Sequence, residues 1–125
     1  MKFGKYYLNK NVSEILNSVR EFNNDEYKPF HKQFNKEKCY RGEQIIFCNS
    51  RWVVLLRAIK NKIYQINLLS PENSFKSYEY SMTEILKFFG NTLRIPIHRR
   101  NYYKWEDKNV QVIVDYKDKP LIGIQ

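Results

Sequence analysis

The sequence predicts a single α+β domain, a mostly antiparallel β-sheet with two helices at about residues 12–22 and 82–89. Three observations support this fold class. A chain of 125 residues has the usual length of one domain. Several runs rich in β-branched and aromatic residues follow one another at hairpin spacing, and two segments carry apolar residues at helical spacing. Because strands and helices segregate along the chain, we take residues 1–125 as one α+β domain.

The first helix is predicted from about Val12 to Phe22. Its apolar stripe recurs at helical spacing and consists of Val12, Ile15, Leu16, Val19 and Phe22. Asn11 is suited to cap its amino end, and Glu14 stands three residues later, as in a capping box. We expect a short strand at residues 5–8 before this helix. After it we expect a basic loop at 25–42 that contains one helical turn.

Three consecutive strands are predicted next, at Gln44–Cys48, Arg51–Ile59 and Lys62–Leu69. The dipeptides Asn49-Ser50 and Lys60-Asn61 separate them at the length of tight hairpin turns. The middle strand is apolar on both faces at mid-length, which indicates a central strand covered on both sides. In the third strand we expect Tyr64, Ile66 and Leu68 to face inward and Gln65 and Asn67 to face outward.

The second helix is predicted from local signals at both ends. Ser81–Glu84 reads as a capping box, and Gly90 is typical of a left-handed carboxyl-terminal cap. An edge strand is expected just before it, at Phe75–Tyr80. The remaining strands are predicted at Leu93–Ile97, Asn101–Trp105, Val110–Tyr116 and Leu121–Ile124, with a turn at Asp118–Pro120 before the last.

The composition points to an anionic partner. Lys and Arg number 22 against 13 Asp and Glu, for a formal charge of +9, and there are 10 tyrosines. Two stretches, 44–71 and 85–105, contain no acidic residue. Such a balance favours nucleic acid or a nucleoprotein as partner. The sequence has neither the apolar run of about 20 residues that a membrane span needs nor a signal peptide. We therefore expect a cytoplasmic protein without membrane partners, located in the host cytoplasm if the chain is viral.

The second acid-free stretch holds the strongest candidate contact site. Cations alternate there with flat rings, in the set Arg94, His98, Arg99, Arg100, Tyr102, Tyr103, Lys104 and Trp105. Guanidinium groups fork onto phosphate oxygens, and aromatic rings stack on exposed bases. The alternative is a solvated strand and turn whose tyrosines pack over the sheet. A secondary basic face is predicted from Arg51, Arg57, Lys60 and Lys62.

Signals of catalysis are weak in this sequence. It contains neither a glycine-rich phosphate loop nor a nucleophile elbow. The spacing of Cys39 and Cys48 fits no common zinc site, so we expect no metal and no cofactor. The run Asp115-Tyr116-Lys117 is similar to the acidic-x-Lys end of a nuclease site. Its partner carboxylate would be Glu106 or Asp107, at a spacing that is short for such a site, or the more distant Glu43. The question of enzyme activity stays open, and the residues favour a protein that is not an enzyme.

Two blocks of the chain resemble the small viral ring nucleases. The resemblance covers about half the chain and rests on Tyr7-Leu8, Asn11, Ser13-x-x-Leu16, the Ser81–Gly90 segment, Leu93-x-Ile95-Pro96, Arg99-Arg100 and Val110–Tyr116. Those proteins are anti-CRISPR enzymes that bind and cleave cyclic tetra-adenylate. The resemblance implies a nucleotide pocket near Ser81, Thr83, Arg99 and Arg100. The family's catalytic histidine precedes the helix-capping Ser-Thr, where this chain has Tyr78-Glu79-Tyr80, so the resemblance does not imply cleavage.

Three functional hypotheses follow from these patterns. The first is a small basic binding protein that engages nucleic acid or a nucleoprotein complex, an anti-CRISPR-like inhibitor of host defence encoded by a virus or mobile element. The second is a protein that binds or cleaves a cyclic oligonucleotide. The third is a protein-interaction module whose basic face meets an acidic protein. The sequence does not decide among RNA, DNA, cyclic nucleotide and protein.

Overall fold

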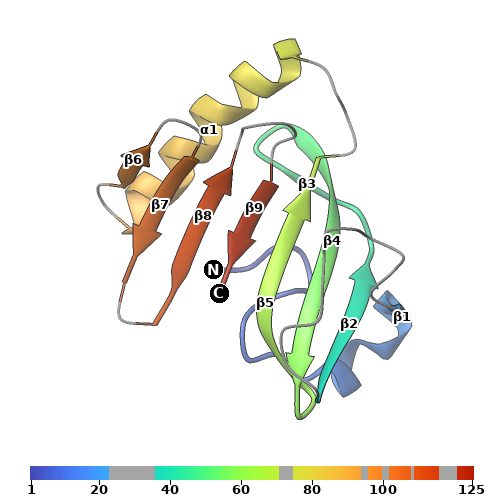
Figure 1. Ribbon diagram of the computed structural model, residues 1–125. Coiled ribbons are helices and arrows are strands. Elements are labelled where there is room, and N and C mark those ends of the chain that lie inside the picture. Colours follow the sequence, from blue (N-terminus) through green and yellow to red (C-terminus); the bar gives the residue numbers. More distant parts are fainter. Residues whose placement is uncertain (23–35, 71–74, 94–95, 100–101, 108, 116–120) are drawn as a thin grey trace.

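The computed structural model describes residues 1–22, 36–70, 75–93, 96–99, 102–107, 109–115 and 121–125. Its centre is an antiparallel sheet in the strand order β1-β2-β4-β5-β9-β8-β7-β6, with β3 paired to β4 (Figure 1). The elements are η1 (Val12–Ser18), β1 (Val19–Phe22), β2 (Glu37–Gly42), β3 (Ile45–Phe47), β4 (Ser50–Ile59), β5 (Lys62–Leu69), α1 (Phe75–Leu93), β6 (Ile97–Arg99), β7 (Tyr102–Glu106), β8 (Gln111–Asp115) and β9 (Leu121–Ile124). The predicted α+β class with a mostly antiparallel sheet is thus confirmed in outline, with the sheet dominating.

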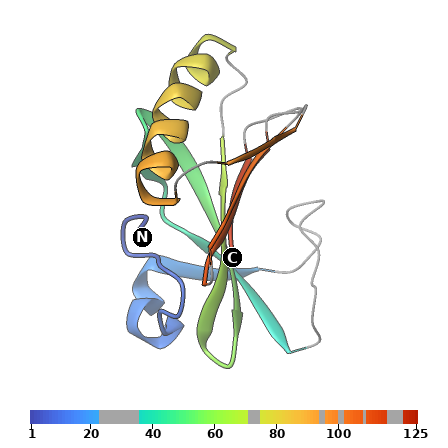
Figure 2. The ribbon, with the colours of Figure 1, turned by 90° about the vertical axis from the view of Figure 1, so that its left-hand side faces the viewer.

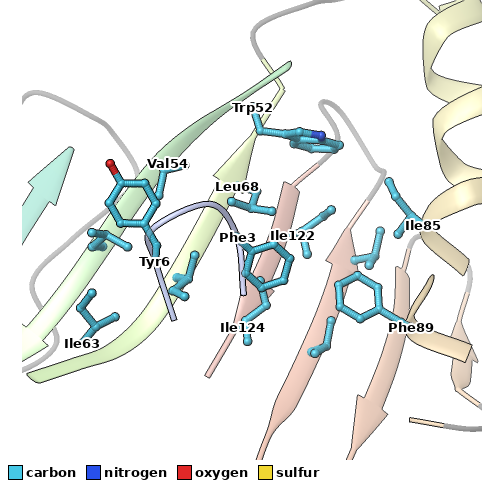
Figure 3. Close-up of a cluster of buried hydrophobic side chains, with 14 of the residues drawn as sticks. Phe3, Tyr6, Trp52, Val54, Ile63, Leu68, Ile85, Phe89, Ile122 and Ile124 are labelled. Atoms are coloured by element: carbon cyan, nitrogen blue, oxygen red, sulfur yellow. The ribbon is translucent and has the colours of Figure 1, made fainter. Parts of the chain in front are cut away.

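One face of the sheet carries the described helices. The helix α1, the 3-10 helix η1 and the amino-terminal segment lie on the same side (Figure 2). Phe3 and Tyr6 from that segment, and Ile85 and Phe89 from α1, point toward the strands (Figure 3). They join one core cluster with the strand residues Trp52, Val54, Leu56, Leu68, Ile122 and Ile124. We call this side of the sheet the covered face, and the opposite side the second face.

The amino-terminal segment is fixed to the sheet by one tyrosine. The hydroxyl of Tyr6 donates to the carbonyl of Ser18 at 2.7 Å and accepts from the backbone N–H of Glu43 at 2.7 Å. Its ring lies directly over Gly42, where a Cβ would come within 2.6 Å of the ring. A glycine is therefore required at the end of β2, because any side chain would displace Tyr6.

The central strand β4 agrees with its prediction. Val54, Leu55 and Leu56 are all 0% exposed, which confirms a central strand buried on both faces. The prediction for β5 is wrong in part, because the register with β4 shifts between Arg57 and Ala58. This bulge brings both Ile63 and Ile66 into the covered-face core, and such a bulge breaks the simple alternation of a strand. Tyr64 is left half-buried, and Asn67, expected to face solvent, is only 6% exposed.

The predicted first helix is wrong beyond its first turns. Residues Val12–Ser18 form a 3-10 helix, interrupted at Ile15 by non-helical backbone angles, and Asn11 makes no side-chain cap. Val19–Phe22, the second half of the predicted helix, is strand β1 paired to β2. Its hydrogen bonds with Cys39–Gly42 outweigh the helical spacing of its apolar residues. Leu16, part of the predicted stripe, is 63% exposed.

The predicted second helix is too short. Phe75–Tyr80, expected as an edge strand, forms the first turns of α1. The expected capping box Ser81–Glu84 therefore lies inside the helix, and Gly90 continues it instead of ending it. The buried side chains Ile85 and Phe89 hold the helix on the sheet, and such packing contributes more to helix stability than local end signals.

The remaining strands match more closely than the helices. The turn Lys60-Asn61 is confirmed, with φ of 51° and 69°, whereas the other hairpin turns at Cys48-Asn49, one residue earlier than predicted. Strand β2 occupies part of the loop that was expected at 25–42, and residues 5–8 form no strand. Strand β6 begins at Ile97, whereas the prediction placed its start at Leu93. β9 coincides with the predicted Leu121–Ile124. The expected turn 118–120 and residues 25–35 of the loop lie outside the described residues. No helix among the described residues is long and apolar enough to cross a membrane.

Candidate nucleic-acid interface

The predicted contact cluster falls mainly on the hairpin β6–β7 at one end of the sheet. β6 is the last strand in the sheet order, and all three of its residues, Ile97–Arg99, are exposed. His98 stands opposite Tyr103, and Arg99 stands opposite Tyr102. Arg94 and Arg100 lie outside the described residues. The structure therefore brings six of the predicted residues onto one hairpin.

The alternation of the strands divides these six residues between the two faces of the sheet. Tyr103 and Trp105 pair with Val114 and Val112, which belong to the covered-face core. His98 shares that side because it stands opposite Tyr103. Arg99, Tyr102 and Lys104 alternate with them and so occupy the second face. A ligand that touched both groups would have to reach around the edge strand β6.

The residues on the covered face form a row of rings that leads from the core to the edge. Phe89 and Trp105 have ring centroids 5.4 Å apart, and Trp105 and Tyr103 are 6.2 Å apart. At the outer end the ring of His98 stacks on Tyr103 at 4.0 Å with an interplanar angle of 7°. Trp105 is 1% exposed, so its predicted role as a surface contact is wrong. The exposed end of the row is the stack of His98 on Tyr103.

The cations of the hairpin lie on the second face. The guanidinium of Arg99 is exposed, and its Nη1 donates to the backbone carbonyl of His98 at 3.3 Å. Lys104 Nζ forms an ion pair with Glu106 at 2.8 Å and keeps 28% of its side chain exposed. Arg99 and Lys104 are therefore the described cations that this hairpin offers to a phosphate, and Glu106 partly neutralises Lys104.

The secondary basic face does not form. Arg57 is 4% exposed and makes a buried ion pair with Glu37. Arg51 is at the start of β4, whereas Lys60 and Lys62 flank the turn at its far end. A strand of this length spans roughly 30 Å. These four residues therefore lie at separate places, and one of them is not at the surface.

A polar cluster that was not predicted from the sequence surrounds this ion pair. Cys39 Sγ donates to Glu37 Oε1 at 3.6 Å on the second face. Burial raises the pKa of Tyr64 to about 12, and the neighbouring Glu37 adds to the rise. Asn67 and Gln65 complete the cluster, joined by a contact of 3.5 Å between their side-chain amides. A single Arg57 within an apolar strand was the one sequence signal that could have predicted a buried partner.

The described thiol of Cys48 is not suited to act as a nucleophile at neutral pH. Burial and the nearby Glu84 raise the pKa of the Cys48 thiol to about 11, so it stays protonated. Within the described part of the chain, no three His, Cys, Asp or Glu side chains come together as metal ligands. Thr83, one residue of the nucleotide pocket that the ring-nuclease resemblance implies, lies inside α1 instead of at its amino end.

No protein family, curated protein or solved structure matches this chain.

Proposed function

We propose that this protein binds single-stranded nucleic acid at the β6–β7 end of the sheet, in a binding role without catalysis. The observation that carries the proposal is the stack of His98 on Tyr103, 4.0 Å apart and nearly parallel, on an exposed edge strand. Flat rings held in this way offer a platform for an unpaired base, and stacking tolerates every base type.

The charge of the molecule supports the same ligand. A formal charge of +9 attracts a polyanion over a long range. Arg99 follows His98 in the sequence and adds an exposed guanidinium on the other face of β6. Because β6 is an edge strand, a flexible strand can contact the rings on one face and Arg99 on the other. The bases of a duplex are already stacked on one another, so a duplex would contact the cations but would not stack on the rings. The geometry therefore favours a single strand.

Fluorescence anisotropy with labelled single-stranded RNA, single-stranded DNA and duplex tests the proposal over a series of salt concentrations. We expect single strands to bind more tightly than duplex, with affinity falling steeply as salt rises. His98→Ala removes the outer ring from an exposed position. It should weaken binding by roughly 1–3 kcal/mol, the contribution of one stacked base.

A matched pair of charge variants separates a specific site from general attraction. Arg99→Gln with Lys104→Gln removes two charges at the hairpin, and Lys60→Gln with Lys62→Gln removes two exposed charges at the β4–β5 turn. The first pair should weaken binding clearly more than the second. Equal losses in both pairs, binding that ignores salt, or no binding to any nucleic acid would each contradict the proposal.

A groove beside α1 favours a protein partner as the second candidate. It has a volume of about 540 Å³ between the β3–β4 turn and the helix, and Phe47, Phe88 and Lys87 line it. Ile46 and Phe88 both line the groove and are 77% and 36% exposed, and exposed apolar side chains that gather at one place are typical of interaction sites. Affinity capture from lysate with nuclease treatment distinguishes the candidates. A partner that is retained after nuclease and lost in Ile46→Glu would favour protein binding.

A further inference from the structure

A second cavity lies at the carboxyl end of β9, between the amino-terminal segment and the connection from β7 to β8. It has a volume of about 280 Å³, just below the range typical of small-molecule sites. Ile66 and Ile124, both almost fully buried, form its inner end, and the partly buried Leu8 and Val110 form its apolar walls. The interior of this cavity therefore suits a small apolar group.

Three polar residues, Lys2, Asn9 and Asn109, also line this cavity. Among the described residues that line the cavity there is no carboxylate. Lys2 Nζ lies 5.2 Å from the ring centroid of Tyr7, which also lines the cavity, and such a cation–π contact restrains the ammonium next to the cavity. The lining residues can thus supply a positive charge and amide groups that donate and accept hydrogen bonds.

Both loops that form the cavity are held by backbone hydrogen bonds. In the first, the N–H of Asn9 donates to Ile63 at 2.8 Å, and the N–H of Lys10 donates to Tyr7 at 3.2 Å. In the second, the N–H of Asp107 donates to the carbonyl of Val110 at 2.9 Å. Since the walls are fixed before a ligand arrives, binding would cost little ordering of the protein.

We propose that this cavity binds a small planar anion, a flat aromatic ring that carries one acidic group. The ring would enter between Leu8 and Val110, the amides of Asn9 and Asn109 would bond its polar edge, and Lys2 would bind the acidic group. A nucleoside monophosphate and an aromatic carboxylate share this chemistry. The inference does not rest on the nucleic-acid function proposed above, because it uses other residues.

Two-dimensional amide NMR tests the inference with adenosine 5′-monophosphate, adenosine, 1-naphthoate and inorganic phosphate as probes. We expect one or both of the planar anions to shift the amide signals of Tyr7, Asn9 and Asn109. Adenosine and inorganic phosphate should bind about tenfold more weakly, because adenosine lacks the acidic group and phosphate lacks the aromatic ring. Tighter binding of the monophosphate would identify a nucleotide site, and tighter binding of 1-naphthoate an aromatic-acid site.

Three variants connect the signal to this cavity. Lys2→Gln should weaken the planar anion about tenfold, whereas Lys38→Gln, at an exposed lysine that does not line the cavity, should leave it unchanged. Val110→Phe should fill the cavity and abolish binding while the folded amide spectrum persists.

The inference is overturned if phosphate or adenosine binds as well as the planar anions, if Lys2→Gln and Lys38→Gln behave alike, or if no probe shifts these amides at millimolar concentration. His98→Ala should not affect this binding, so the two proposals fail independently.

Discussion

Both faces of the β4–β5 strand pair contain buried residues at mid-length, but the two faces are chemically different. On the covered face, Val54, Leu56, Ile66 and Leu68 are all 0% exposed and entirely apolar. On the second face the same strands bury Leu55 beside Arg57 and Asn67, which are 4% and 6% exposed. Burial in this sheet therefore does not imply an apolar environment.

The difference shows how each face contributes to the fold. Apolar contacts on the covered face are non-directional, so they stabilise the sheet without requiring one exact alignment. Buried polar groups are costly unless they meet their partners. The ion pair of Glu37 with Arg57 joins β2 to β4, and it is satisfied in one register of those strands. We infer that the covered face supplies most of the stability and that the second face restricts the register.

The largest expected effect comes from breaking the buried ion pair. Glu37→Ala leaves the Arg57 charge buried without its carboxylate, and we expect a loss of about 3–5 kcal/mol in the free energy of unfolding, measured with urea. The double variant Glu37→Leu with Arg57→Met should recover much of this loss, because it removes both charges. A cost below about 1 kcal/mol for the single change would show that the pair contributes little.

The apolar core of each face can be compared through two leucines that are both 0% exposed. Leu68 belongs to the large covered-face cluster, and Leu55 to the small cluster with Phe22 and Cys39. Each change to Ala should cost about 2–5 kcal/mol by chemical denaturation. We expect Leu68→Ala to be the more costly, since more fixed neighbours surround the cavity it leaves. A greater loss at Leu55 would reverse the assignment of stability to the covered face.

The two faces should also respond to alkaline pH through different tyrosines. Burial raises the pKa of Tyr6, beside the covered-face core, and raises that of Tyr64 on the second face to about 12. In the unfolded chain both ionise near pH 10, so the folded state retains more protons above that pH, and stability falls as the pH rises above about 10. For Tyr64 the fall continues to about pH 12. The slope cannot exceed about 1.4 kcal/mol per pH unit and per group, and solvent screening makes it smaller at the half-buried Tyr64. Denaturation at several pH values should show a shallower fall in Tyr64→Phe.

The smallest expected effect concerns the amide of Asn67 on the second face. Its Nδ2 is buried and makes no hydrogen bond with the described residues. Replacement by Leu, which has a similar shape, should change the free energy of unfolding by about 1 kcal/mol or less, since little bonding is lost. Asn67→Asp is the matched control and should cost clearly more, because it buries a charge. A large loss for Asn67→Leu would indicate that the amide has an essential partner.

The sequence predicted strands better than helices for a physical reason. The β-branched runs and the Lys60-Asn61 turn are local signals, and β4, β5 and β9 agree with them. The prediction of a helix at 12–22 failed because Val19–Phe22 pairs with a strand that is distant in the sequence. At the candidate site the sequence indicated the right hairpin. It could not show that Trp105 faces the core or that His98 stacks on Tyr103, because both depend on strand register. The Glu37–Arg57 pair also could not be predicted from the sequence, because it depends on contacts between separate strands.

The position of β9 has a consequence for how the chain reaches its native state. The sheet order places this late segment between β5 and β8, so residues as distant in the sequence as Leu69 and Leu121 are neighbours. Until β9 inserts, the strands made earlier and the β6–β8 strands are two separate sheets with exposed inner edges. Contacts between distant segments form slowly, and uncovered edges invite pairing with other chains. We therefore expect aggregation to compete with folding mainly at the step in which residues 121–124 insert between the two sets of strands.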